Sequence, residues 1–186
     1  NMMGKQREAF RRVIDDQDNN MNQLMMRVLK DSDTEVVKAM FENFFLNANF
    51  IGWQTQEEMR RKYNCNIPWA ILLDPTSACN LKCTGCWAAE YGNKLNLTFD
   101  EIDSIIMQGK ELGVYFYIYT GGEPLVRKKD LIALCRKHHD CQFLTFTNGT
   151  LIDEEFADQM LDVKNLVPAI SVEGFEEATD GRRGNG

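Results

Sequence analysis

The sequence predicts an α/β protein in which a parallel sheet follows a segment of helices. Three observations favour this class: apolar residues recur at helical spacing over the first 64 residues, four short apolar runs follow, and helical patterns separate these runs. Strands that alternate with helices in this way pair in parallel through right-handed crossovers. We therefore divide the chain into a helical extension, residues 1–64, and a sheet-forming part, residues 65–186.

The helical extension is predicted from two apolar stripes, over residues 21–29 and 36–45. Capping boxes, in which a hydroxyl and a carboxylate satisfy the free donors of a first turn, are predicted at Ser32–Glu35 and Thr55–Glu58. We interpret the stripes as core packing and not as a ligand pocket, because an apolar helix face normally buries against a neighbour.

The sheet-forming part begins with WAILLD, residues 69–74, a continuous apolar run that suits a strand buried on both faces. Thr98 and Glu101 then form a capping box that starts a helix, and Gly113 is placed to end it. Further strands are expected at residues 114–119, 142–147 and 166–172, with helices from about Lys128 to His138 and from Asp153 onward.

The composition is that of an ordinary globular protein, 44% hydrophobic and 26% charged. Its net charge of −7 gives no support to nucleic-acid binding, since phosphate contacts need a basic surface. No apolar run reaches the roughly 20 residues of a membrane span, and the opening NMMGKQREAFRR lacks the apolar stretch of a secretory signal. We expect an acidic, soluble, cytoplasmic protein whose cysteines are reduced.

Three of the six cysteines, Cys79, Cys83 and Cys86, form a C-x3-C-x2-C string directly after the first predicted strand. A structural zinc site would need a fourth ligand, and we interpret the two histidines, His138 and His139, as caps of helix carbonyls at the opposite edge of the sheet. Three thiolates can instead hold three irons of a [4Fe–4S] cluster and leave the fourth iron open. The remaining cysteines are isolated and are interpreted as buried or incidental thiols: Cys65, Cys135 and Cys141.

The other unusual segments fall on the same edge as the cysteine string. CNLKCTGC, GGEP, TNG and SVEG each follow a predicted strand, and the carboxyl ends of parallel strands meet where such folds place their chemistry.

In this combination the sequence resembles the radical S-adenosylmethionine (radical SAM) superfamily, over about residues 69–184. The resemblance implies a partial (β/α)6 barrel, of which about four βα strands are present here. It implies a [4Fe–4S] cluster on the three cysteines, with S-adenosylmethionine bound at the open iron. It also implies an oxidoreductase- or transferase-type enzyme in which reductive cleavage yields a 5′-deoxyadenosyl radical that takes hydrogen from a substrate. A reductant such as flavodoxin or ferredoxin would supply the electron.

The resemblance assigns further residues to S-adenosylmethionine. The GGEP loop would hold the methionine amino group, and the ends of the third and fourth strands would contact the ribose or the carboxylate. The set is Gly121, Gly122, Glu123, Pro124, Thr147, Asn148, Ser171, Glu173 and Arg183. Ordinary alternatives stay open, since GGEP and NG are also turn signals and Arg183 could be a solvated loop charge.

Two positions depart from the family pattern. Glu173 stands where Asp is commoner, and Gly85 stands where many relatives carry an aromatic residue beside the adenine. The nearest aromatic residue here is Trp87, one position past Cys86.

The substrate is not predicted. The loops are similar to those of anaerobic sulfatase maturases and coenzyme PQQ synthesis enzymes, and also to those of hopanoid-biosynthesis enzymes, which act on peptides and lipids respectively. A non-catalytic iron–sulfur or zinc protein is the alternative class. We also expect the chain to be an N-terminal piece of a longer protein, because the family barrel has two further strands and the strand at 166–172 would otherwise expose an apolar edge.

Overall fold

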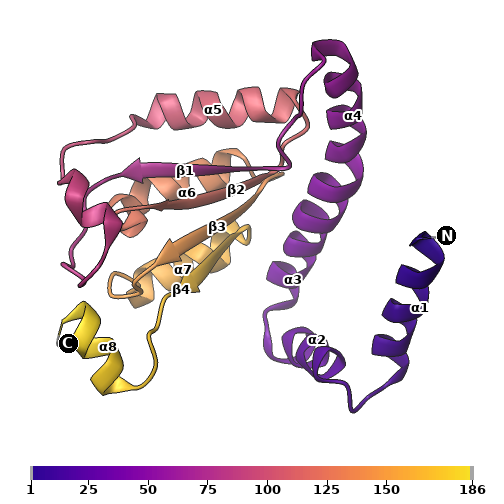
Figure 1. Ribbon diagram of the computed structural model, residues 1–186, viewed down its shortest axis with the longest axis horizontal. Coiled ribbons are helices and arrows are strands. Elements are labelled where there is room, and N and C mark those ends of the chain that lie inside the picture. Colours follow the sequence, from indigo (N-terminus) through magenta and orange to yellow (C-terminus); the bar gives the residue numbers. More distant parts are fainter. Residues whose placement is uncertain (1, 185–186) are drawn as a thin grey trace. The chain divides into compact units, whose positions relative to one another are not determined.

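The computed structural model describes residues 2–184, and the side chains of all of them but residues 2–6, 10, 89 and 90. Over these residues it contains a sheet of four parallel strands in the order β1-β2-β3-β4, with a helix in each crossover (Figure 1). The predicted α/β class is therefore confirmed. The strands are β1 (Ala70–Thr76), β2 (Phe116–Gly121), β3 (Gln142–Thr147) and β4 (Leu166–Ile170). The crossover helices are α5 (Phe99–Glu111), α6 (Lys128–Lys137) and α7 (Glu154–Val163).

The other helices lie before the sheet, in its loops, and after it. They are α1 (Met2–Asp15), α2 (Asn20–Asp31), α3 (Thr34–Met40), the π-helix η1 (Phe41–Ile51), α4 (Gly52–Tyr63), the 3-10 helices η2 (Trp87–Tyr91) and η3 (Pro124–Arg127), and α8 (Glu176–Arg183). Residues 2–63 are thus mostly helical, as predicted. None of the described helices combines the length and apolar character needed to cross a membrane.

The chain divides into two compact units, the first ending at Lys38 and the second starting at Ala39. The predicted domain boundary after residue 64 stays a prediction, but η1 and α4 pack in the same unit as the sheet.

One face of the sheet packs against α5, α6 and α7 and forms the core (Figure 1). Tyr117, Tyr119 and Phe143 are fully buried there, with the rings of Tyr119 and Phe143 stacked 5.5 Å apart. On the opposite face Leu72 is 59% exposed and Phe146 is 46% exposed. The prediction that the first strand is buried on both faces is therefore wrong for the residues that the structure describes.

The strand-start edge of the sheet is closed by η1 and α4 through buried side-chain amides. Asn43 donates to the carbonyl of Cys141 at 3.2 Å, and Gln56 donates to the carbonyl of Gly113 at 2.8 Å. Because both amides are buried, these bonds satisfy carbonyls that water does not reach. They hold η1 and α4 against this edge, and the long loops lie at the opposite edge.

The capping predictions have a mixed outcome. Thr98 and Glu101 form the expected capping box, and Gly113 ends the helix region with a φ of +85°. Ser32 instead ends α2, and the N–H groups at the start of α3 bond to the carboxylate of Asp33. Thr55 lies inside α4, because η1 runs into α4 without a break. Those two predicted boxes are wrong.

The histidines lie at the strand-start edge, as predicted, but His138 does not cap helix carbonyls. Its buried ring places Nε2 2.9 Å from Oδ1 of Asp103 on α5. Burial lowers the pKa of His138, and the hydrogen bond with Asp103 only partly opposes that effect.

Candidate functional site

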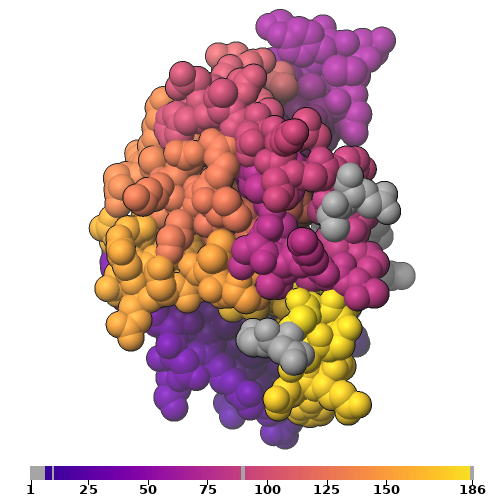
Figure 2. Space-filling model, turned by 90° about the vertical axis from the view of Figure 1, so that its left-hand side faces the viewer, coloured from indigo at the N-terminus to yellow at the C-terminus, as the bar shows by residue number. Residues whose placement is uncertain are grey.

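The loops at the carboxyl edge of the sheet enclose a cavity of about 150 Å³. It brings together nine of the residues predicted to bind a cofactor: Cys79, Cys83, Cys86, Gly122, Glu123, Thr147, Asn148, Ser171 and Arg183. Figure 2 faces this edge, and the cysteine segment (magenta) lies beside α8 (yellow). The N–H of Thr84 donates to the carbonyl of Arg182 at 2.8 Å and joins these two segments. Gly121, Pro124 and Glu173 do not line the cavity.

The cysteine loop turns tightly enough to direct three half-buried thiols into this cavity. Gly85 has a φ of +72°, a conformation that favours glycine, and the N–H of Cys86 bonds to the carbonyl of Cys83 at 3.2 Å. Glycine adopts this backbone conformation without strain, which suits Gly85 to the turn in this chain.

The thiols fit a cationic iron–sulfur group. Burial raises the pKa of Cys79; the N–H of Leu81 partly offsets this, while Glu123 and the other two thiols add to it. Thiolate charge at this position is therefore unfavourable until a metal centre neutralises it. The described residues contain no group of three or more His, Cys, Asp or Glu side chains placed to hold a single metal ion. Three soft sulfur donors in one loop are nonetheless the ligands that iron–sulfur clusters use.

The GGEP loop is tied to the start of the cysteine loop. The N–H of Gly122 bonds to the carbonyl of Thr76 at 2.9 Å, and that of Glu123 bonds to the carbonyl of Ala78 at 2.8 Å. A Cβ on Gly122 would lie only 2.2 Å from the Ala78 oxygen. Glycine is needed here because two backbones approach each other closely.

The carboxylate of Glu123 is buried and accepts three hydrogen bonds. Its Oε1 receives the N–H of Leu125 at 3.0 Å and the hydroxyl of Thr147 at 2.7 Å, and its Oε2 receives the N–H of Asn148 at 2.8 Å. A carboxylate offers about four acceptor positions, so one remains on Oε2. Glu123 thus joins the ends of β2 and β3 beneath the cavity.

Asn148 extends this network to the cysteine loop. Its side chain donates to Oδ1 of Asn80 at 3.0 Å, and Asn80 donates in turn to the hydroxyl of Thr150 at 2.7 Å. Sequence reasoning missed Asn80, although its place between two of the three cysteines, Cys79 and Cys83, was a usable signal.

Arg183 points to the cavity but is engaged by a neighbour. Its Nε lies 3.1 Å from Oε1 of Glu173, and Arg182 lies 2.7 Å from the other carboxylate oxygen. Hydrogen bonds from the two arginines lower the pKa of Glu173. The predicted pairing of Arg183 with a cofactor carboxylate stays a prediction, and it would have to compete with Glu173.

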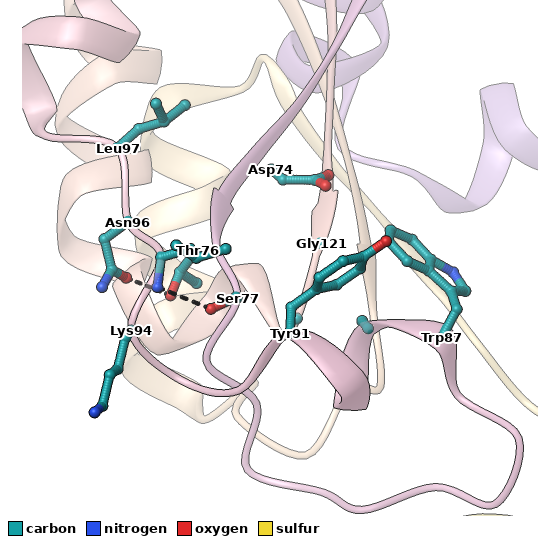
Figure 3. A pocket seen from close by; sticks show the side chains of 12 residues that line it. Asp74, Thr76, Ser77, Trp87, Tyr91, Lys94, Asn96, Leu97 and Gly121 are labelled. Carbon is teal, nitrogen blue, oxygen red and sulfur yellow. Dashed lines mark hydrogen bonds between the residues drawn. The ribbon is translucent and has the colours of Figure 1, made fainter.

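A second cavity, of about 490 Å³, lies beside the first and shares Gly122 with it (Figure 3). Asp74 and Tyr91 line it together with Trp87. Sequence reasoning assigned no role to Asp74 or Tyr91, because nothing local in the chain shows that β1 and η2 face the same space.

A parallel α/β sheet that carries a three-cysteine loop after its first strand defines a class of proteins built to hold a cofactor at the carboxyl edge. Comparison with known proteins then identifies the family. The Radical SAM superfamily matches residues 73–186, more than half of the chain, and the chain belongs to this superfamily. Its members are enzymes, and membership implies a [4Fe–4S] cluster and S-adenosylmethionine.

Individual relatives agree with this family. The chain is 32% identical over 120 residues to Fe-coproporphyrin III synthase of Methanosarcina barkeri, covering 61% of this chain and 29% of the synthase. It is 32% identical over 115 residues to the PqqA peptide cyclase of Bradyrhizobium diazoefficiens, covering 60% and 30%. The chain thus spans less than a third of the length of either relative.

Among solved structures, Streptococcus suis SuiB has a similar fold. Crystal structures of SuiB bound to its precursor peptide SuiA and bound to S-adenosylmethionine both give a TM-score of 0.59, at 23% identity. They cover 71% of this chain and 31–32% of SuiB. The likeness supports the partial barrel predicted for the sheet.

Proposed function

We propose that the chain forms the cofactor-binding part of a radical SAM enzyme that generates a 5′-deoxyadenosyl radical from S-adenosylmethionine and uses it to take hydrogen from a substrate. The observation that carries the proposal is the cavity at the carboxyl edge. It gathers three thiols that follow β1, the buried carboxylate of Glu123 after β2, Asn148 after β3, and Arg183 on α8 after β4.

Cys79, Cys83 and Cys86 would hold a [4Fe–4S] cluster and leave one iron for S-adenosylmethionine. When bound, the cluster supplies the electron that cleaves the sulfonium, after reduction by a donor such as flavodoxin or ferredoxin. The residues of the chain orient the ligands and exclude water.

Glu123 and Arg183 would hold the two ends of the methionine group. The free acceptor position on Oε2 of Glu123 suits an ammonium group, and the guanidinium of Arg183 suits a carboxylate. Ser171 lines the same cavity from the end of β4, where it would contact the ribose.

Neither membership of the family nor the names of the relatives identify the substrate. SuiB was crystallised with a precursor peptide, PqqA peptide cyclase is named for a peptide, and the synthase is named for an iron porphyrin. We therefore propose a peptide or small molecule without choosing between them.

Anaerobic reconstitution tests the proposal. The reconstituted chain, given dithionite and S-adenosylmethionine, should release 5′-deoxyadenosine. Cys79→Ala should lose both the absorbance near about 400 nm and the product, because thiolates are the ligands for this cluster. Cys65→Ala is the matched control, since Cys65 is exposed and outside the loop.

Two results would count against the proposal. A protein that binds iron but forms no 5′-deoxyadenosine, even when it carries the residues that follow in its relatives, would favour a non-catalytic iron–sulfur protein. Zinc in place of iron after aerobic and anaerobic purification would favour a structural metal site.

A further inference from the structure

The second cavity lies on the β1 side of the GGEP loop, at the end of the sheet opposite β4. Its volume of about 490 Å³ falls in the range of small-molecule sites. Trp87 and Tyr91, both on η2, line it from one side, and Asp74 lines it from β1 (Figure 3).

The carboxylate of Asp74 is available to a ligand. Among the side chains that the structure describes, Asp74 has no hydrogen-bond or ion-pair partner, and it is exposed at the cavity. Gly121 makes room for it, because a Cβ there would lie 3.0 Å from the Cβ of Asp74 and 2.8 Å from the Thr76 oxygen. Lys94 also borders the cavity, but its side chain extends away from the aromatic pair (Figure 3).

The aromatic side chains are equally available. Trp87 is 57% exposed and Tyr91 is 58% exposed, with ring centroids 5.7 Å apart in an edge-on arrangement. In Figure 3 the tyrosine hydroxyl, the indole and the carboxylate of Asp74 all face the same space. Aromatic faces and a carboxylate together attract an organic cation, whereas a neutral group gains only the apolar part of that attraction.

Two other polar side chains of the wall, those of Thr76 and Ser77, already have hydrogen-bond partners. The hydroxyl of Thr76 bonds to Asn96 at 2.5 Å, and Ser77 Oγ accepts the N–H of Leu95 at 3.1 Å. They fix the loop of residues 94–97 against the end of β1. The recognition chemistry of this cavity is therefore that of Asp74 and the aromatic pair.

The order of the strands indicates that the second cavity does not bind the nucleoside of S-adenosylmethionine. The residues proposed to contact the ribose and the methionine carboxylate, Ser171 and Arg183, follow β4, whereas this cavity is formed at β1. Because β2 and β3 lie between them, a ligand held at both the cysteines and β4 extends away from Asp74.

We propose that this second cavity binds an ammonium group of the substrate, with Asp74 as its counter-charge and Trp87 and Tyr91 as its aromatic walls. The inference deepens the proposed function, on which it rests: the substrate is an amine-bearing molecule, held by its cationic end beside the cluster cavity.

Fluorine NMR of the cluster-reconstituted chain labelled with 5-fluorotryptophan tests this. The chain has three tryptophans, and Trp87→Phe identifies the signal of Trp87. The probes are n-butylammonium, which mimics a lysine side chain, glycinamide, which mimics a peptide N-terminus, and n-butanol as the neutral control. The signals of Trp53 and Trp69 report whether each variant is folded.

We expect the Trp87 signal to shift saturably when an ammonium probe is added. Whichever of n-butylammonium and glycinamide binds more tightly shows which kind of amine fits the cavity. Asp74→Asn should weaken this binding about 10- to 100-fold, the usual effect of losing a charge-assisted bond. Trp87→Leu, followed through fluorotyrosine at Tyr91, provides a second test.

Three outcomes would overturn the inference: equal binding of n-butanol, unchanged binding in Asp74→Asn, or a Trp87 shift produced by adenosine and absent with amines. The last would assign the cavity to the nucleoside. Since 5′-deoxyadenosine formation is measured separately, a chain that cleaves S-adenosylmethionine but ignores amines refutes only this inference. A chain that binds amines but forms no 5′-deoxyadenosine refutes only the proposed function.

Discussion

Replacing Glu123 with Gln tests the hydrogen-bond network beneath the first cavity, the cavity that the three cysteines line. The carboxylate is 1% exposed and accepts bonds from Leu125, Thr147 and Asn148. An amide has one acceptor oxygen and one NH2 group, so in either orientation a donor faces a backbone N–H. Turned one way it opposes the N–H of Asn148, and turned the other way it opposes that of Leu125.

The expected loss of stability follows from this mismatch. One buried backbone N–H left without an acceptor costs about 1–3 kcal/mol, while the remaining bonds survive in weaker, uncharged form. For a chain of this size that corresponds to a fall in Tm of about 2–12 °C. We expect the free energy of unfolding to fall with an unchanged denaturant dependence, because the fold itself is kept.

Urea denaturation followed by circular dichroism measures this change. The matched control is Glu111→Gln, an exposed carboxylate at the end of α5 that should shift stability by less than about 0.5 kcal/mol. Glu123→Gln should also bind S-adenosylmethionine about 10- to 100-fold more weakly while it retains its cluster. The electron paramagnetic resonance spectrum of the cluster would report this change. A Glu123→Gln chain as stable as the control would refute the three-bond network.

Further predictions concern the rest of the sheet. Burial lowers the pKa of His138 in the folded protein. Between this pKa and the unfolded value of about 6.5, the imidazole is neutral in the native state and protonated in the unfolded state. The contribution of His138 to the unfolding free energy is therefore complete above about pH 6.5 and is lost as the pH falls toward the folded pKa. His138→Gln, which can still donate to Asp103, should flatten that part of the profile of unfolding free energy against pH, and an unchanged slope would contradict this. Gly122→Ala should displace the cysteine loop, since its Cβ would lie 2.2 Å from the Ala78 oxygen, and iron content after reconstitution should fall; full iron loading would show that the loops can separate. Gln56→Met should cost about 1–3 kcal/mol in urea denaturation by leaving a buried carbonyl without a donor, and a neutral result would mean that water replaces the amide.

The sequence was a good guide where a local pattern determines the structure. The apolar runs and the Thr98 capping box depend on neighbouring residues, and they are found close to where they were expected. The second strand begins at Phe116 and not at residue 114, because Val114 donates its N–H to Gly109 and closes α5. The Ser32 box is wrong because Asp33, one residue later, is the better acceptor.

Long-range contacts were beyond the same reasoning. No spacing rule indicates that Gln56 reaches Gly113, that His138 meets Asp103, or that Asp74 shares a cavity with η2. The gathering of the cysteine, GGEP and TNG loops could be predicted only because parallel strands put their carboxyl ends on one edge. Which atoms then bond depends on the packing of the whole unit.

The structure also changes the meaning of the GGEP motif. At the level of the sequence, a turn and a ligand site were alternative interpretations of this motif. In the structure the same loop is hydrogen-bonded to the backbone of the cysteine segment and also borders both cavities. Gly122 lets the loop approach Ala78, and Glu123 joins the loop to Thr147 and Asn148. Substitutions here therefore move the cysteine loop and β3 together, so a loss of cofactor binding does not by itself show that the substituted side chain touches the cofactor. That role requires a variant whose unfolding free energy is kept and whose ligand affinity alone falls.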